Sequence, residues 1–193
     1  MKADASVYEG KQVIRRALAR VPGLDRVDPN IVTLSILVPG ALAGVALWQG
    51  WWLVAALAML ARMVLATMDG YIAERFGRST RLGAYLNRLV TELADATLLL
   101  GLFPHADAIW VAMALASGWL VNVTGVLGTI TGGSIQWTGP AGQADRLALV
   151  VAASLLAQIW FMNWTLLCVL LVTLSIITIA RRTSRSIAEL RRA

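Results

Sequence analysis

The sequence predicts an all-α integral membrane protein: one domain over residues 1–193, with six transmembrane helices and a preceding amphipathic helix. Hydrophobic residues make up 58% of the chain, and its mean hydropathy is +0.69, which is more apolar than a soluble domain. Apolar runs recur that are long enough to cross the ~30 Å hydrocarbon layer, which takes about 20 helical residues. The connections between these runs also alternate between basic segments and segments without lysine or arginine.

The first predicted element is a basic amphipathic helix over residues 7–21. Its apolar side chains at Val7, Ile14, Leu18 and Val21 recur at helical spacing, and lysine and arginine residues lie between them. A helix of this kind lies on a membrane surface with its apolar face toward the acyl chains. A Pro-Gly dipeptide follows Val21 and ends the helix.

The six predicted membrane helices then follow in order, one for each apolar run. Pro29 marks the approach to the first of them, because proline is favoured in the first turn of a helix. Gly40 and Gly44 in this helix form a small-xxx-small pair that permits close contact with another helix. The predicted ranges are 31–50, 52–73, 83–103, 108–130, 146–162 and 164–181.

The distribution of positive charge predicts the orientation of the bundle. Basic residues precede the first helix, separate the second from the third, open the fifth and follow the sixth. The connections around residues 49–50, 104–107 and 162–163 contain no lysine or arginine. The positive-inside rule therefore predicts that both termini are cytoplasmic. The net charge of +6 is explained by topology and lipid head groups rather than by nucleic-acid binding.

Charged residues inside the second and third helices are the strongest indication of a functional site. Arg62 and Asp69 share a face of the second helix, and Arg88, Glu92 and Asp95 share a face of the third. Ionisable groups at membrane depth are costly unless they are paired or face a polar cavity. Antiparallel helices with a short connection pack side by side, which predicts one polar cavity near the cytoplasmic surface. Mutual neutralisation of these charges is the alternative.

The centre of the chain resembles the signature of the CDP-alcohol phosphotransferase (CDP-alcohol phosphatidyltransferase) family, D-x2-D-G-x2-A-R-x8-G-x3-D-x3-D. The second aspartate of the signature falls on Asp69 and its first glycine on Gly70. Ala73 and Gly83 follow at the intervals that the signature requires. Thr80, three residues before Gly83, is also a common choice in the family.

Two flanking segments extend this resemblance over nearly the whole chain. The sequence PNIVT at residues 29–33, which contains Asn30, resembles the segment that leads into the family's first membrane helix. The sequence GPAGQADR at residues 139–146 resembles a GP-x-G-x-x-DR segment of one bacterial branch and ends at Arg146. By the resemblance, the residues that contact the CDP moiety are Gly70, Ala73, Thr80, Gly83, Asn30 and Arg146.

The resemblance implies an enzyme of phospholipid biosynthesis in the bacterial inner membrane, with a cytoplasmic active site. Such enzymes transfer a phosphatidyl or related phosphoryl group from a CDP-linked lipid or CDP-alcohol donor to an alcohol or alcohol-phosphate acceptor and release CMP. Mg²⁺ or Mn²⁺, held by carboxylates, neutralises the donor pyrophosphate. The resemblance also implies a homodimer, for which Gly118, Gly125 and Gly128 suit close packing.

The signature is incomplete in this chain. Ala66 stands in the position of the first aspartate, and Asn87 and Thr91 stand in the third and fourth. Glu74 replaces the signature arginine, and Gln143 stands where a basic residue is expected. Losing anionic ligands weakens the hold on a hard cation, which needs oxygen ligands and chiefly carboxylates. Two fully occupied metal sites are therefore not expected.

The residues that remain define a candidate site and leave three functions open. We expect Asp69, Asn87, Thr91 and Asp95 to hold one metal ion, and Asp95 or Glu92 to act as the general base toward the acceptor hydroxyl. The first function is an active transferase with this shifted carboxylate set. The second is a family member without catalysis that acts as a structural or regulatory subunit. The third is a small transporter, for which we find no internal repeat.

Overall fold

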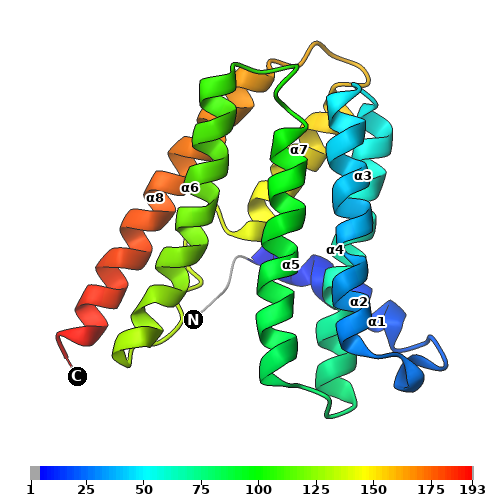
Figure 1. Ribbon diagram of the computed structural model, residues 1–193, viewed down its shortest axis with the longest axis vertical. Coiled ribbons are helices and arrows are strands. Elements are labelled where there is room, and N and C mark those ends of the chain that lie inside the picture. Colours follow the sequence, from blue (N-terminus) through cyan, green and yellow to red (C-terminus); the bar gives the residue numbers. More distant parts are fainter. Residues whose placement is uncertain (1–4, 193) are drawn as a thin grey trace. The chain divides into compact units, whose positions relative to one another are not determined.

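The computed structural model describes residues 5–192 of the chain, with side chains described from residue 12 onward, and that part is helical without strands (Figure 1). The prediction of an all-α protein is therefore confirmed for the described residues. The elements in chain order are α1 (Ala5–Leu18), the 3-10 helix η1 (Leu24–Arg26), α2 (Pro29–Ser35), α3 (Leu37–Trp48), α4 (Trp52–Arg75), α5 (Arg81–Leu100), α6 (Ala108–Leu127), the 3-10 helix η2 (Gly128–Thr131), α7 (Gln143–Leu156) and α8 (Trp164–Leu190).

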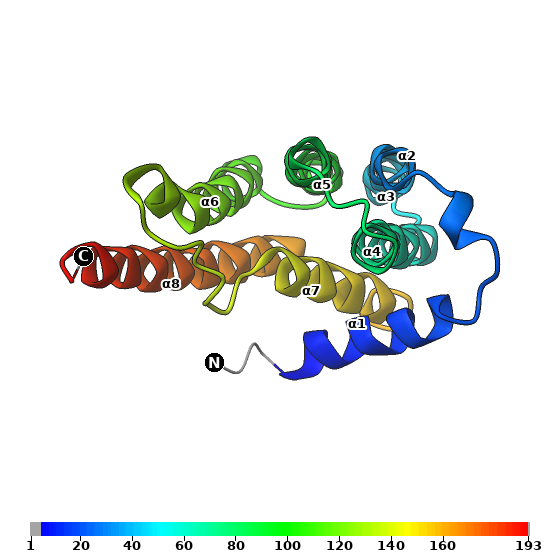
Figure 2. The ribbon, with the colours of Figure 1, turned by 90° about the horizontal axis from the view of Figure 1, so that it is seen from below.

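The chain divides into two compact units, Met1–Gly101 and Leu102–Ala193. In the first unit, α2 and α3 pack against both α4 and α5, and Figure 2 shows these helices end-on. In the second unit, α6 packs along α8. The first unit contains the whole of the signature region, so the site is built from α2, α4 and α5.

Four helical segments among the described residues are long and apolar enough to cross a membrane: Pro29–Trp48, Trp52–Arg75, Ala108–Thr131 and Trp164–Leu190. The other two predicted spans correspond to α5 and α7. The α5 helix has 20 residues but carries the arginines and carboxylates of the site, which lower its hydropathy. The α7 helix has 14 residues, a length of about 21 Å at 1.5 Å per residue. The predicted number of six spans is therefore not established by length and composition.

Several helix boundaries differ from the predicted ones for physical reasons. The first predicted helix is broken between α2 and α3, because the ring of Pro39 clashes with the carbonyl of Ser35 and provides no N–H donor. The α7 helix ends at Leu156 rather than at residue 162. The α8 helix continues to Leu190, because no proline or glycine interrupts residues 164–190.

Two glycines of α3 bring that helix very close to α5, as their spacing predicts. A Cβ atom added at Gly40 would lie 2.6 Å from the Cβ atom of Ala94, and one added at Gly44 would overlap the carbonyl oxygen of Thr97. Gly101 in turn packs against the carbonyl oxygen of Gly44. This contact fixes the height of α5 relative to α3, and so the positions of the polar residues that α5 carries.

The glycines of the second unit are used differently from the prediction. A Cβ atom at Gly118 would lie 3.4 Å from Nε of Arg146, and one at Gly125 would lie 2.7 Å from Nη1 of Arg182. Gly128 packs against a side chain of α8 in the same way. These positions accommodate side chains of their own unit, so they do not support the expected homodimer, which stays a prediction.

The N-terminal helix α1 is attached to α4 by one apolar and one charged contact. Leu18 belongs to a buried cluster with Val32 and Ile72. At the surface, Nη2 of Arg15 lies 2.6 Å from Oε2 of Glu74, the residue that replaces the signature arginine. A helix lies at Ala5–Leu18, where residues 7–21 were predicted, and its amphipathic character and its position on a membrane surface stay predictions.

Candidate ligand site around Asp69

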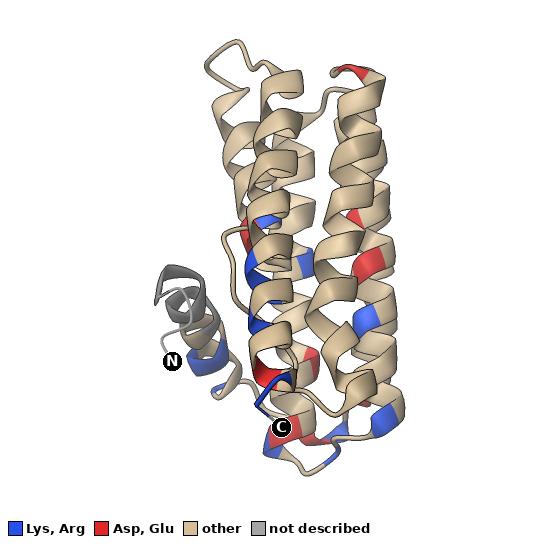
Figure 3. Ribbon diagram, turned by 90° about the vertical axis from the view of Figure 1, so that its left-hand side faces the viewer, with Lys and Arg blue, Asp and Glu red and all other residues tan. Residues whose placement is uncertain are grey.

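Asp69 is the centre of the candidate site and is almost fully buried in α4, with 3% of its surface exposed. Its Oδ2 accepts hydrogen bonds from the hydroxyl of Thr33 and from Nδ2 of Asn87, both at 2.7 Å. Its Oδ1 accepts a hydrogen bond of 2.6 Å from the backbone N–H of Gly70. One carboxylate therefore connects α2, α4 and α5. Figure 3 shows the positions of the charged residues along the helices, most of whose length is uncharged.

The N-terminal ends of α2 and α5 meet beside this carboxylate. The side chain of Asp28 caps α2 by accepting a hydrogen bond from the N–H of Asn30 at 2.8 Å, and Pro29 occupies the first turn. Thr80 caps α5 by accepting from the N–H of Gly83 at 2.9 Å. A Cβ atom at Gly83 would lie 3.1 Å from Oδ1 of Asn30. The structure thus brings together three of the predicted nucleotide contacts: Asn30, Thr80 and Gly83.

Gly70 lies one residue after Asp69, and apart from its two chain neighbours and the adjacent backbone of α4 nothing lies within 4 Å of the position of a Cβ atom there. Packing within the protein therefore does not require glycine at this position. Open space beside a buried carboxylate is what a bound phosphate or nucleotide needs for close approach to the backbone. Ala73, three residues further along α4, is half-buried.

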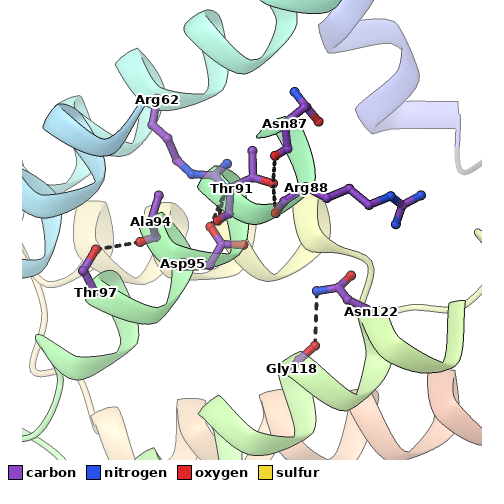
Figure 4. Close-up of polar contacts among 9 residues, drawn as sticks. All are labelled: Arg62, Asn87, Arg88, Thr91, Ala94, Asp95, Thr97, Gly118 and Asn122. Carbon is purple, nitrogen blue, oxygen red and sulfur yellow. Dashed lines mark hydrogen bonds and ion pairs between the residues drawn. The ribbon is translucent and has the colours of Figure 1, made fainter. Parts of the chain in front are cut away.

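Asp95 is held by an arginine rather than by the residues around Asp69. Nη2 of Arg62 lies 2.5 Å from Oδ1 of Asp95 and donates a hydrogen bond of 3.1 Å to the carbonyl of Thr91. Both charged residues are buried, with 4% of Arg62 and 9% of Asp95 exposed. Figure 4 shows Arg62 reaching across from α4 to this part of α5. The predicted alternative, in which charges neutralise each other, is therefore realised for this pair.

Thr91 and Glu92 lie on α5 between Asn87, which contacts Asp69 of α4, and Asp95. The hydroxyl of Thr91 donates to the carbonyls of Asn87 at 2.6 Å and Arg88 at 3.1 Å, so its proton is used within its own helix. Glu92 is half-buried, three residues before Asp95. The antiparallel register thus places Asn87 beside Asp69 and places Asp95 beside Arg62, two helical turns further along α5.

The groups around Asp69 present one carboxylate to a cation. The hydroxyl of Thr33 and Nδ2 of Asn87 donate hydrogen bonds to this carboxylate. Mg²⁺ and Mn²⁺ take oxygen ligands, so the amide of Asn87 would serve as a ligand only with its oxygen turned toward the ion. A second cation needs further carboxylates, and Asp95 is bound to Arg62. Among the described residues, no three His, Cys, Asp or Glu side chains lie together as a metal-binding group.

Arg146 belongs to the second unit and is also buried, with 6% of its surface exposed. Its Nη1 donates a hydrogen bond of 3.1 Å to the carbonyl of Ala141. Asp145, beside it, accepts a hydrogen bond of 3.0 Å from the N–H of Gly142 at the start of α7. The GP-x-G-x-x-DR segment therefore forms a turn in which the side chains of Asp145 and Arg146 make hydrogen bonds with the backbone of the same segment.

The sequence does not single out Thr33, which is noted there only as part of the PNIVT segment, because its contact with Asp69 depends on the packing of α2 against α4. The sequence places Arg62 on the face of Asp69 but does not identify its partner. The signal for Arg62 was present, because an arginine within an apolar run requires a partner.

Comparisons with known proteins agree with this fold. No protein-family model matches the chain. The inner membrane protein YnbA of Escherichia coli (strain K12) is 30% identical over 144 residues, which cover 72% of this chain and 71% of YnbA. Because a likeness of this extent shows a common family, and because YnbA is an inner membrane protein, this chain is a membrane protein.

Solved structures of the phosphatidylinositol phosphate synthase PgsA1 of Mycobacterium tuberculosis have the same fold. The structure with CDP-DAG bound has a TM-score of 0.68 at 18% identity and covers 93% of this chain and 92% of its own. The complex with manganese and citrate has a TM-score of 0.71 at 22% identity and covers 91% and 88%. The chain thus belongs to the family of the inner membrane protein YnbA and has the fold of the phosphatidylinositol phosphate synthase PgsA1.

Proposed function

We propose that the protein is a membrane-embedded phosphotransferase of phospholipid biosynthesis. It binds a CDP-linked donor at the Asp69 site and transfers the phosphatidyl or related group to an alcohol or alcohol phosphate, with release of CMP. The observation that carries this proposal is the position of Asp69. It is buried where α2, α4 and α5 meet, at the signature position, in a chain with the fold of a synthase whose structure contains CDP-DAG.

The proposal includes the membrane arrangement that the sequence predicts. In this arrangement α5 and α7 also cross the membrane, in addition to the four segments that are long and apolar enough to span by themselves. The polar face of α5 is turned toward Asp69 and Arg62, which reduces the cost of placing this helix in the membrane. Both termini and the site are then on the cytoplasmic side of an inner membrane.

The residues of the site suit the steps of such a transfer. Asp69, with Asn87 and Thr33, would hold one Mg²⁺ or Mn²⁺ ion, which neutralises charge on the pyrophosphate. The acceptor hydroxyl oxygen attacks the phosphorus of the transferred group, and the bond from this phosphorus to the CMP oxygen breaks. Asp95, or Glu92 one turn before it, takes the proton of the acceptor hydroxyl. CMP leaves with the electron pair of the broken bond.

Calorimetry tests the binding part of this proposal. Purified protein in detergent micelles should bind CDP in the presence of Mg²⁺ or Mn²⁺. Asp107→Asn serves as the matched control, since Asp107 caps α6 and has no part in the site, and it should bind CDP like the wild type. If neither CDP nor CMP binds with either metal ion, the proposal is wrong.

Asp95→Asn tests the catalytic part. We expect the rate of CMP release from a CDP-linked lipid to fall about 10²- to 10⁴-fold, the usual contribution of a general base, while calorimetry still detects CDP binding. Asparagine has the shape of aspartate and still accepts a hydrogen bond from Arg62, but it leaves the buried guanidinium without a counter-ion, which costs about 3–5 kcal/mol. Thermal unfolding of the variant therefore accompanies the rate measurement, and the rate is compared for the folded protein. Full activity of the variant would exclude Asp95 as the base and leave Glu92.

A second function is favoured by the same contacts. Three protein donors already occupy the carboxylate of Asp69, and Arg62 neutralises Asp95. These contacts suit a family member without catalysis that acts as a structural or regulatory subunit. Such a protein would bind CDP but release no CMP from CDP-linked lipid with glycerol phosphate, inositol phosphate, serine or any other acceptor. The fold of a synthase favours either function over the transporter.

A further inference from the structure

The connection between α7 and α8 exposes three large apolar side chains in a row (Figure 1). Ile159, Trp160 and Phe161 have 81%, 78% and 87% of their surfaces exposed. The whole connection, residues 157–163, contains no charged residue. Contact of so much apolar surface with water is unfavourable, so residues 159–161, which we call the apolar turn, need an apolar neighbour.

The polar groups of this connection are compatible with an apolar surrounding. The N–H groups of residues 157–160 donate hydrogen bonds of 2.9–3.2 Å to carbonyls at the end of α7. The side chain of Gln158 donates to the carbonyl of Ser154 at 3.3 Å, and Oδ1 of Asn163 accepts from the N–H of Leu166 at 3.1 Å. Because an unpaired polar group is costly away from water, these contacts allow the turn to leave water.

The starts of α6 and α8 show where the membrane boundary lies in the second unit. Both helices belong to segments that are long and apolar enough to span, Ala108–Thr131 and Trp164–Leu190, and α6 packs along α8. The N–H of Asp107 donates a hydrogen bond of 2.9 Å to the hydroxyl of Thr165, so the two segments begin at the same level. The apolar turn ends three residues before α8, a distance of at most about 11 Å. It therefore lies at the level where both spans enter the membrane.

The α7 helix leads into the apolar turn and is too short to cross a membrane by itself. Its 14 residues have a length of about 21 Å, against about 30 Å of hydrocarbon. Short apolar helices are accommodated by thinning of the bilayer and by flanking residues that reach the interface. Tryptophan is enriched at this depth because its ring is both apolar and able to donate a hydrogen bond.

We propose that the apolar turn inserts into the lipid interface of the membrane and anchors the connection between α7 and α8 there. Its partner is the acyl-chain and glycerol region of the bilayer rather than anionic head groups, because the connection has no lysine or arginine. A second copy of the chain fits less well, since a stable protein interface takes about 20–30 residues from each side. The inference goes beyond the proposed function and does not depend on it.

Spin labels measure the depth of the turn. The full chains of Trp160→Cys and Phe161→Cys, each carrying a nitroxide, are placed in vesicles of phosphatidylethanolamine and phosphatidylglycerol. Collisions with O₂, which concentrates among acyl chains, and with a water-soluble Ni²⁺ chelate give the depth by electron paramagnetic resonance. We expect both labels to lie about 5–10 Å below the head-group boundary. Both native side chains are exposed, so the labels disturb no internal packing.

Two further labels calibrate the measurement. Ile176→Cys places a label at an exposed position within the Trp164–Leu190 span, where the label should lie deeper than those of the turn. Ser79→Cys places one in the exposed connection between α4 and α5, where the Ni²⁺ chelate should reach it freely. Cys168 is the single cysteine of the sequence and is fully buried, so the wild type treated with the same reagent gives the background.

Fluorescence tests the native side chain of Trp160. The chain has eight tryptophans, and the difference between the emission of the wild type and that of Trp160→Phe isolates this one. We expect lipids brominated on their acyl chains to quench the difference signal and iodide in the water to leave it unchanged.

A Ni²⁺ collision rate at either turn position equal to that of Ser79→Cys would place the turn in water and overturn the inference. Low collision rates with both reagents would mean that protein covers the turn, which overturns it as well, and so would quenching of the difference signal by iodide. These measurements involve no nucleotide. If the labels lie at the expected depth but CDP does not bind, the proposed function is wrong and the membrane anchor stands.

Discussion

Asp69→Asn is expected to abolish detectable Mn²⁺ binding and to weaken CDP binding at least about 100-fold, in a protein that still folds. Loss of a residue that only orients a metal ligand already costs about 10- to 100-fold in affinity, and Asp69 is the remaining anionic ligand of the signature. The amide oxygen of asparagine still accepts the hydrogen bonds that Thr33 and Asn87 donate. Its NH2 group replaces the oxygen that accepts from the N–H of Gly70, and loss of that hydrogen bond costs about 1–3 kcal/mol. The measurements are calorimetry with CDP, electron paramagnetic resonance of Mn²⁺ and thermal unfolding in the same detergent.

The control for Asp69→Asn is Thr33→Ser, which keeps the hydroxyl that donates to Asp69 and removes one methyl group. It should bind Mn²⁺ and CDP like the wild type. Retention of wild-type CDP affinity in a folded Asp69→Asn variant would mean that the nucleotide binds elsewhere. In that case the position of Asp69 could not carry the proposed function.

Gly44→Ala should lose much more stability than a methyl addition at an open position of the first unit. The added methyl group would overlap the main-chain carbonyl of Thr97, which cannot turn aside as a flexible side chain can. Overpacking of this kind costs about 1–3 kcal/mol and sometimes more, so we expect at least the upper end of this range. Because α5 must move away from α3, Asn87 is displaced from Asp69 and CDP binding is lost as well.

Gly70→Ala is the matched control for Gly44→Ala, since apart from its two chain neighbours and the adjacent backbone of α4 nothing lies within 4 Å of the added methyl group. An alanine in place of a helical glycine stabilises a helix by up to about 1 kcal/mol. Thermal unfolding should therefore show an unchanged or higher midpoint for Gly70→Ala and a clearly lower one for Gly44→Ala. Equal midpoints for the two variants would contradict the close packing of α3 on α5.

The features that the sequence predicted correctly depend on local pattern. The apolar runs predicted the helical fold, and the spacing of Gly40 and Gly44 predicted a close helix contact. The pairing of Asp69 with Asn87 follows from a short connection between two antiparallel helices, because residues at equal distances from the turn meet. These three inferences need no knowledge of which helices are neighbours beyond the turn itself.

The features that the sequence did not predict depend on packing between elements that are distant along the chain. Thr33 reaches Asp69 because α2 packs against α4. The side chain of Arg62 is long enough to reach from α4 to Asp95 on α5. The spacing of charges along a single helix cannot predict a pairing between two helices. Packing between helices also explains how α5 can carry a buried carboxylate, since Asp95 is stabilised by Arg62 of α4.

The ion pair between Arg15 and Glu74 has a consequence for the evolution of this chain. In the signature, position 74 is an arginine, and in this chain the side chain there lies 2.6 Å from a guanidinium of α1. Restoring arginine at this position alone would place two positive charges against each other and weaken the contact between α1 and α4, which the buried cluster around Leu18 also maintains. Positions 15 and 74 should therefore covary, and an alignment of relatives should show a neutral or acidic residue at position 15 wherever position 74 is arginine.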